Sequence, residues 1–207
     1  MHKYTRDSGY FNKIDTTEKA YIFGFLLADG HNDVKRGRIE IKLKAEDNEH
    51  LNKIKVALNY NGPLYYEKKT NSYRLRIIDK KLSKQLETYG MISNKTFNLK
   101  FPHFLNHKLI SHFIRGYFDG DGTIWRRKRR GKQLVFGICG AVENFLYNIQ
   151  QILVINFKLN FTRMELPRKD STFRFVYEGN RQVKKISDYL YKDATIYLDR
   201  KYNQFLR

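Results

Sequence analysis

The sequence predicts an α+β fold made of two similar halves, each with the element order αββαββα and an antiparallel sheet. Three observations lead to this prediction. An apolar segment at residues 22–30 recurs in kind at residues 114–122, which is 92 positions further along the chain. Each copy carries small residues four positions apart and ends in Asp-Gly. Residues 38–44 then alternate strictly between apolar and polar, the pattern of a strand with one buried and one exposed face.

The first half should open with a helix over residues 16–29. Asp15 and Glu18 resemble an N-cap and its partner three residues later, and Gly30 should end the helix. The chain then predicts a strand at 38–44, a helix at about 46–59, a hairpin of strands at 64–69 and 73–78, and a helix over 80–89 that stops at Gly90.

The second half repeats this order. We expect a helix over 107–121 capped by Asn106, a strand from 133 to 139, a helix over 142–155, strands near 159–166 and 173–178, and a last helix at about 181–192. Arg74 aligns with Arg174, so the offset between halves grows from 92 to 100 while the elements correspond. The predicted domains are residues 1–96 and 107–207, joined by a linker at 97–106.

Small residues on one face of each repeated helix predict how the halves meet. Residues four apart share a helix face, so two flat strips arise, formed by Gly24 with Ala28 and by Gly116 with Gly120. Such strips let two helix backbones pack more closely than large side chains allow. Paired in this way, the helices deliver one carboxylate each, from Asp29 and Asp121, to the same end of the pair.

Composition limits the partners that such a protein can have. The 207 residues include 40 Lys and Arg against 21 Asp and Glu, a net charge of +19. A field of that sign predicts a polyanionic partner, most often nucleic acid. A membrane is disfavoured because no apolar run of about 18 residues and no long basic amphipathic helix is present. A single cysteine, Cys139, excludes an intramolecular disulfide and a thiolate metal cluster.

The two acids point to metal-dependent hydrolysis of phosphodiesters. A carboxylate at the C-terminal end of a helix is unfavourably placed against the helix dipole, and two close together predict a bound cation. Carboxylates hold Mg²⁺, which keeps most of its waters and bridges to phosphate oxygens. Each motif alone is better explained as a core helix with a helix stop. Two copies with the same register favour a nuclease.

At these residues, 22–30 and 114–122, the chain resembles the LAGLIDADG family of homing endonucleases and intron maturases. The resemblance implies that Asp29 and Asp121 are the acidic metal ligands, helped by the carbonyl groups of Ala28 and Gly120. It implies Mg²⁺ as cofactor, with Mn²⁺ able to substitute. Asp119 occupies a place that is usually structural in the family, and Leu27 stands there in the first copy. We therefore leave Asp119 out of catalysis.

The family also surrounds its paired acids with basic or polar groups. The positions that resemble them here are Lys42 on the alternating strand, Lys95, and Lys201. For each lysine a solvated surface role is an equal alternative. Alignment of the halves gives Gly137 as the counterpart of Lys42, which predicts two unequal active centres. The six histidines show no metal-ligand spacing.

The exposed face of each sheet is the predicted DNA-binding surface, forming a saddle on double-stranded DNA. A twisted antiparallel ribbon fits the major groove, where Arg and Lys can contact guanine. The predicted strand residues are Arg38, Glu40, Lys42, Lys44, Lys68, Arg74, Arg76, Arg163 and Arg174. Ordinary solvent exposure is the alternative for this face. The basic loop 126–132, with Arg126, Arg127, Arg129 and Arg130, is predicted to bind phosphates.

The resemblance implies a monomeric endonuclease that cuts both strands of a long asymmetric site, Asp29 and Asp121 each serving one strand. A maturase that binds its host intron RNA, and a catalytically silent DNA-binding protein on the same fold, remain alternatives. We expect an intracellular protein, because the chain starts without an apolar signal segment. We also expect a freestanding one, because the chain has neither the terminal Cys or Ser nor the His-Asn ending of an intein. The excess of Asn over Ala favours an A·T-rich genome, in a bacterium, a phage-infected cell or an organelle.

Overall fold

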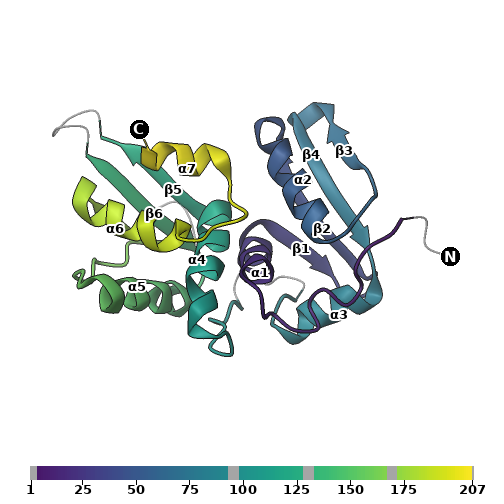
Figure 1. The fold of residues 1–207 in the computed structure, drawn as a ribbon, viewed down its shortest axis with the longest axis horizontal. Helices are drawn as coiled ribbons and strands as arrows, with labels where there is room; N and C mark the ends of the chain where they lie inside the picture. The colour runs from purple at the N-terminus through teal and green to yellow at the C-terminus, as the bar shows by residue number, and fades with distance from the viewer. Residues whose placement is uncertain (1–3, 93–97, 128–132, 167–171, 207) are drawn as a thin grey trace.

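The computed structural model describes residues 4–92, 98–127, 133–166 and 172–206. It is an α+β fold with two similar halves side by side, joined where α1 meets α4 (Figure 1). The elements of the first half are α1 (Thr17–Asp29), β1 (Gly30–Asp33), β2 (Arg38–Lys44), η1 (Ala45–Asp47), α2 (Asn48–Ala57), β3 (Leu64–Glu67), η2 (Lys68–Thr70), β4 (Ser72–Ile78) and α3 (Lys80–Thr88). Those of the second half are α4 (His107–Asp121), β5 (Gly122–Arg126), β6 (Leu134–Gly140), α5 (Glu143–Phe157), β7 (Phe173–Glu178), α6 (Asn180–Tyr191) and α7 (Asp199–Leu206).

The two long motif helices begin at polar caps. Asn106 caps α4 as predicted, because its side chain accepts from the amide of Lys108 at 3.0 Å. The predicted cap of α1 is wrong by one residue. Thr16 is the N-cap and accepts from the amide of Lys19 at 3.2 Å, while Asp15 forms an ion pair with the ammonium group of Lys19 at 2.9 Å.

Both sheets are antiparallel, in the order β1-β2-β4-β3 and β5-β6-β7. The second sheet has one strand fewer because the predicted strand at 159–166 is wrong: in the described residues it makes only an isolated bridge between Glu165 and Arg174. Its carbonyl groups bond to side chains instead. That of Asn160 accepts from the hydroxyl of Tyr177 at 3.2 Å, and that of Thr162 accepts from the amide of Gln150 at 2.9 Å.

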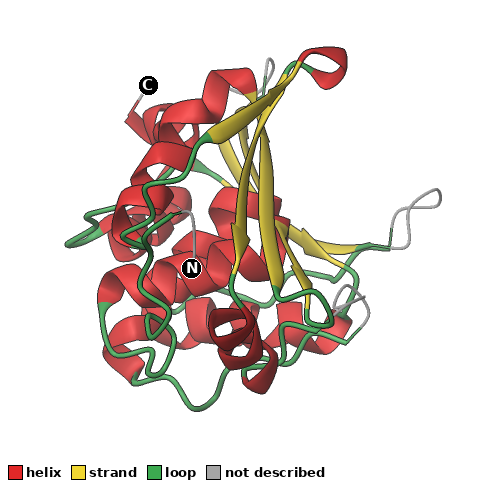
Figure 2. Ribbon diagram, turned by 90° about the vertical axis from the view of Figure 1, so that its right-hand side faces the viewer, coloured by secondary structure: helices red, strands yellow, loops and turns green. Residues whose placement is uncertain are grey.

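The helices cover one side of the two sheets and leave the other side open (Figure 2). On β2 the apolar residues Ile39, Ile41 and Leu43 are buried toward the helices, as the alternation predicted. The opposite face of each sheet, which we call the open face, therefore carries the intervening residues. No helix in the described ranges is long and apolar enough to cross a membrane.

Glycine brings the backbones of α1 and α4 into direct contact. A β-carbon on Gly24 would collide with the carbonyl oxygen of Phe113 and lie 3.1 Å from its carbonyl carbon. A β-carbon on Gly116 would collide with the carbonyl oxygen of Tyr21 and lie 2.9 Å from its carbonyl carbon. Any side chain at either place would force the helices apart, so this close seam explains the small residues in both motifs.

Candidate active site

The two motif helices end beside each other, each with an aspartate as its last residue. Asp29 ends α1 and Asp121 ends α4. A β-carbon on Gly120 would collide with that of Ala28 and lie 3.5 Å from Oδ2 of Asp29. The Asp29 carboxylate therefore lies over the end of α4, next to the residue that precedes Asp121. Asp29 is exposed and Asp121 is partly exposed, so solvent or a ligand can reach both.

The charges of both carboxylates affect the same side chain, the hydroxyl of Tyr117. Burial raises the pKa of the Tyr117 hydroxyl well above its ordinary value, and the charge of Asp121, a hydrogen bond to Asp121 and the charge of Asp29 raise it further. The same hydroxyl donates to the carbonyl oxygen of Cys139 at 3.3 Å. Sequence reasoning missed Tyr117, although it replaces Phe25 of the first motif and so adds a hydroxyl group to the seam.

Lys201 lies buried beneath this end of α4. Its ammonium group donates to three carbonyl oxygens, those of Phe118 at 2.7 Å, Gly120 at 3.1 Å and Gly122 at 2.6 Å. Burial lowers the pKa of Lys201 to about 8, although the charges of the nearby acids, Asp29 and Asp121 included, act to raise it. The lysine is thus close to the acids but not solvated. It holds the C-terminal carbonyls of α4, where a cation interacts favourably with the negative end of the helix dipole.

Asp119, the second acid of the second motif, belongs to a different environment. It is 2% exposed and accepts hydrogen bonds from the hydroxyls of Tyr21 at 2.7 Å and Tyr191 at 3.2 Å, and from the amide of Leu198 at 2.8 Å. Burial raises its pKa despite these bonds. Its partners come from α1, α6 and the segment before α7, so it links the two halves inside the protein.

The donors at the acid pair suit a hard cation. Carboxylate oxygens of Asp29 and Asp121 and the carbonyl oxygens of Ala28 and Gly120 are the ligand types that Mg²⁺ and Ca²⁺ prefer. In the described part of the chain, three or more His, Cys, Asp or Glu side chains do not gather anywhere as a ready-made metal site. A cation here would therefore need water or substrate oxygens to complete its coordination, as Mg²⁺ commonly does.

Strand register corrects the alignment of the two halves around the acids. Gly30 pairs with Ile41 in the first sheet, and Gly122 pairs with Ile138 in the second. The counterpart of Lys42 is therefore Cys139, one residue beyond each pair, and the prediction of Gly137 is wrong. The thiol of Cys139 indeed contacts the carbonyl oxygen of Asp121 at 2.9 Å. Lys42 pairs with Arg74 and Cys139 with Arg174, which agrees with the predicted alignment of the two arginines.

Two glutamates organise the basic residues on the open face of the first sheet. Glu40 forms ion pairs with Arg38 at 3.6 Å, Arg74 at 3.3 Å and Arg76 at 2.5 Å. Burial alone would raise the pKa of Glu40, but hydrogen bonds from Arg76 and Arg74 outweigh it and lower the pKa. Glu67 contacts Lys42 at 2.7 Å and also Arg74. Five of the residues predicted to bind DNA thus form one network with Glu67: Arg38, Glu40, Lys42, Arg74 and Arg76.

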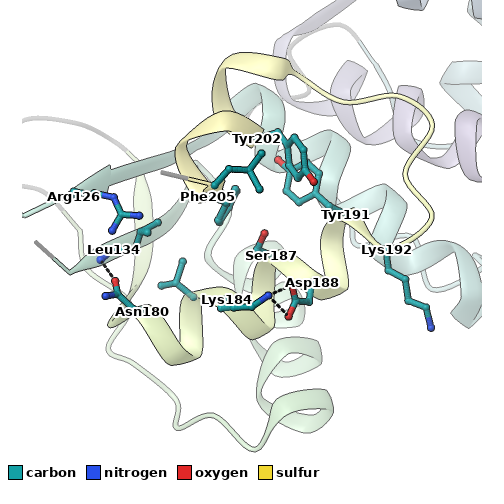
Figure 3. Close-up of a pocket in the computed structure, with 12 residues that line it drawn as sticks. Arg126, Leu134, Asn180, Lys184, Ser187, Asp188, Tyr191, Lys192, Tyr202 and Phe205 are labelled. Atoms are coloured by element: carbon teal, nitrogen blue, oxygen red, sulfur yellow. Dashed lines mark hydrogen bonds and ion pairs between the residues drawn. The ribbon is translucent and has the colours of Figure 1, made fainter.

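The first two residues of the basic loop, Arg126 and Arg127, have different surroundings. Arg127 pairs with Glu178 at 2.6 Å and is about half exposed. Arg126 stands opposite Leu134 in the sheet, and Leu134 belongs to the core. Figure 3 shows Arg126 with Leu134 and Asn180 in a pocket that α6 and α7 also line. The structure therefore places Arg126 on the helical side of the sheet, contrary to the expectation that it faces DNA.

The remaining predicted residues are exposed or lie outside the residues that the structure describes. Lys44, Lys68 and Arg163 are exposed. Within the described ranges, none of the three has an ion pair. Arg174 is half exposed and pairs with Glu165 at 2.8 Å. Lys95, Arg129 and Arg130 lie outside the described residues.

A family model agrees with this arrangement of two repeats. The model described as LAGLIDADG-like domain matches residues 16–89 and 108–190, which is well over half of the chain. The chain belongs to the LAGLIDADG family. Both LAGLIDADG matches contain one motif helix, one terminal aspartate and one sheet, so the family relationship covers both halves of the acid pair.

Curated relatives from Methanocaldococcus jannaschii match this chain over a small part of much longer proteins. A glutamine–fructose-6-phosphate aminotransferase is 29% identical over 171 residues, which is 79% of this chain and 15% of the relative. An RNA polymerase subunit, Rpo1C, is 28% identical over 136 residues, 60% of this chain and 15% of the relative. The chain thus spans about a seventh of the length of these relatives.

Solved LAGLIDADG structures share the fold at low identity. The homing endonuclease I-GzeII in complex with its DNA target has a TM-score of 0.61 and 16% identity, covering 90% of this chain and 87% of that one. I-SmaMI bound to uncleaved DNA with calcium ions has a TM-score of 0.59 and 13% identity, covering 90% and 87%. At this identity the likeness shows the common architecture of two halves and two sheets.

Proposed function

We propose that this protein is a homing endonuclease that makes a double-strand break in a long asymmetric DNA site by metal-dependent hydrolysis. The observation that carries the proposal is the convergence of Asp29 and Asp121 at one end of the α1–α4 seam. The two acids come from equivalent places in the two halves, and the two strands of DNA are related by similar symmetry. One acid is therefore available for each strand.

The side chains around the acids support hydrolysis. Asp29 and Asp121, with the carbonyls of Ala28 and Gly120, would hold Mg²⁺, which supplies an activated water and neutralises charge on the phosphate. Lys201 keeps the end of α4 in place through three hydrogen bonds, so the Asp121 carboxylate starts from a fixed backbone. Lys42 follows Ile41, the register partner of Gly30, and so adds positive charge beside Asp29, where phosphate charge would develop.

DNA is the polyanion that best fits the open face. The chain has a net charge of +19, and a row of arginines lies on the open face of the first sheet. Solved relatives of this fold are named as bound to target DNA. The curated relatives have unrelated activities yet share this segment, which supports a mobile module that inserts into different genes. We propose that the protein acts as a monomer.

The first experiment defines the target and then removes the acids. A plasmid library of random inserts is incubated with the protein and Mg²⁺, and the cut ends are sequenced. Asp29→Asn and Asp121→Asn are then tested on the selected plasmid. Each should abolish double-strand cleavage and leave binding equal or tighter, because each removes negative charge beside phosphates. Asp15→Asn is the matched control, since it removes an exposed charge from the far end of α1 and should cut normally.

Two outcomes would contradict the proposal. Linearisation by both single variants in Mg²⁺ would remove the acids from catalysis. Tight binding of intron RNA with no cleavage of any DNA would favour the maturase alternative. Replacing Mg²⁺ with Ca²⁺ should permit binding without cutting, because Ca²⁺ is larger and accepts looser geometry.

A further inference from the structure

The open faces of the two sheets carry different chemistry at matching positions. In the first sheet, the row one step out from the acids is formed by His31, Glu40 and Arg76. The matching row in the second sheet is formed by Thr123, Gly137 and Val176. The first row holds an ion pair, whereas the second has no charged side chain.

The uncharged row forms a small apolar shelf. A β-carbon on Gly137 would lie 3.2 Å from Oγ1 of Thr123 and 3.5 Å from Cγ2 of Val176, so these two side chains close over the glycine. Thr123 is exposed and Val176 is partly exposed. The hydroxyl oxygen of Thr123 faces Gly137, both Thr123 and Val176 carry methyl groups, and Gly137 keeps the surface low between them.

The next row outward is formed by Trp125, Val135 and Glu178, and two of these three residues are also apolar. Trp125 is 39% exposed and stands opposite Val135, which is fully buried. The charged residue of this row, Glu178, is paired with Arg127 at 2.6 Å. The two charged groups at the margins of this face, Arg174 and Glu178, are thus both held in ion pairs by neighbours.

An apolar surface of this kind can contact one specific group in the major groove, the methyl group of thymine. Among the four bases only thymine presents a methyl group there, and apolar side chains contact it. Guanine needs donors such as Arg or Lys, which the second row lacks and the first sheet has in Arg38, Arg74 and Arg76.

We infer that the second half recognises its DNA half-site through apolar contact between thymine methyl groups and the Thr123–Val176 shelf. This inference rests on the proposed function, because it requires the open face to lie on DNA. It assigns different codes to the two half-sites: guanine contacts by the first sheet and thymine methyl contacts by the second.

Uracil substitution tests the methyl group alone, because a uracil–adenine pair keeps every hydrogen-bonding group of thymine–adenine. A preferred duplex is selected from a random DNA library in Ca²⁺, and uracil then replaces thymine in one half-site at a time. Dissociation constants are measured by fluorescence anisotropy. In one half-site only, each lost methyl at the shelf should weaken binding about fourfold, the equivalent of one buried methylene.

A double-mutant cycle assigns that effect to the shelf. Thr123→Ser removes one protein methyl, and Val176→Thr replaces a methyl with a hydroxyl while it keeps the side-chain shape. In each variant, replacing thymine with uracil should no longer weaken binding at the base pair that the substituted residue contacts. Thr195→Ser is the matched control, an exposed threonine between α6 and α7, and should leave the penalty unchanged.

The outcomes separate this inference from the proposed function. Sequence-selective binding or cutting with equal or absent uracil effects in both half-sites would overturn the inference and leave the nuclease intact. A uracil penalty that persists unchanged in both Thr123→Ser and Val176→Thr would also overturn it. Failure to select any DNA sequence would overturn both.

Discussion

The two halves agree closely in their interiors and differ on their open faces. Inside, Gly24 and Gly116 make the same backbone contact with the opposite helix. Outside, Lys42 beside one acid corresponds to Cys139 beside the other, and an arginine–glutamate network corresponds to the Thr123–Val176 shelf. The seam allows almost no choice of residue because a single carbon atom would collide. Side chains on the open face contact one another at partly exposed ion pairs, such as Arg76 with Glu40 and Arg174 with Glu165, so their identities can follow the ligand.

The largest expected effect tests the shared interior. Gly24→Ala and Gly116→Ala should each lower the free energy of unfolding by about 3 kcal/mol or more, because the added carbon meets backbone that cannot move aside. Urea denaturation followed by circular dichroism measures the loss. If the two halves share the same interior packing, the two variants should lose similar amounts of free energy of unfolding.

Gly90→Ala is the control for the seam. Gly90 has a φ of +89° and nothing within 4 Å of an added carbon, so alanine there should cost only the backbone strain of about 1 kcal/mol. A Gly24→Ala or Gly116→Ala variant no less stable than Gly90→Ala would show that the helices can separate freely, against the proposed seam.

A second prediction separates the two active centres. Lys42→Met should slow cleavage of the strand served by Asp29 by about tenfold or more, because it removes a positive charge that the strand register places beside that acid. Cys139→Ser, at the corresponding position, should change the other strand much less. Opposite strands carrying different fluorophores report both rates from one time course. Equal slowing of the two strands by Lys42→Met would assign the lysine a general role in binding.

The smallest expected effect concerns the start of the basic loop. Arg127→Ser should reduce the slope of log binding constant against log salt by about 0.9, the value for one phosphate contact, on target and random DNA alike. Arg126→Ser is the matched control, because Arg126 lies on the helical side of the sheet. A larger change for Arg126→Ser than for Arg127→Ser would show that the loop turns its other side to DNA.

Much of the fold could be predicted because local patterns encode it. The helix expected at 107–121 and the strand expected at 38–44 appear as His107–Asp121 and Arg38–Lys44. The helix follows from apolar spacing and its Asn106 cap and the strand from strict alternation, and these patterns depend only on neighbours in sequence. The approach of Asp29 to Asp121 was also predictable, since small residues four apart already define the seam.

Other parts depend on contacts that no local pattern records. Strands β1 and β5 follow the motif helices without a turn signal, and no residue range could be assigned to them. Helix α7 is mostly polar, and its one buried residue, Lys201, is explained only by the carbonyl oxygens of α4. The match of Lys42 to Cys139 needed the strand register, because the connection between β1 and β2 differs in length from that between β5 and β6.

The hydrogen bond between Tyr21 and Asp119 shows that the halves have lost their independence. At the matching place of Tyr21 the second motif has Phe113, and at the matching place of Asp119 the first motif has Leu27. A symmetric dimer of second halves would bury two carboxylates with no tyrosine from the opposing motif helix. A dimer of first halves would offer two such tyrosines and no acid. If the protein arose by duplication of a self-associating ancestor, this exchange is the step after which neither half could return to pairing with its own copy.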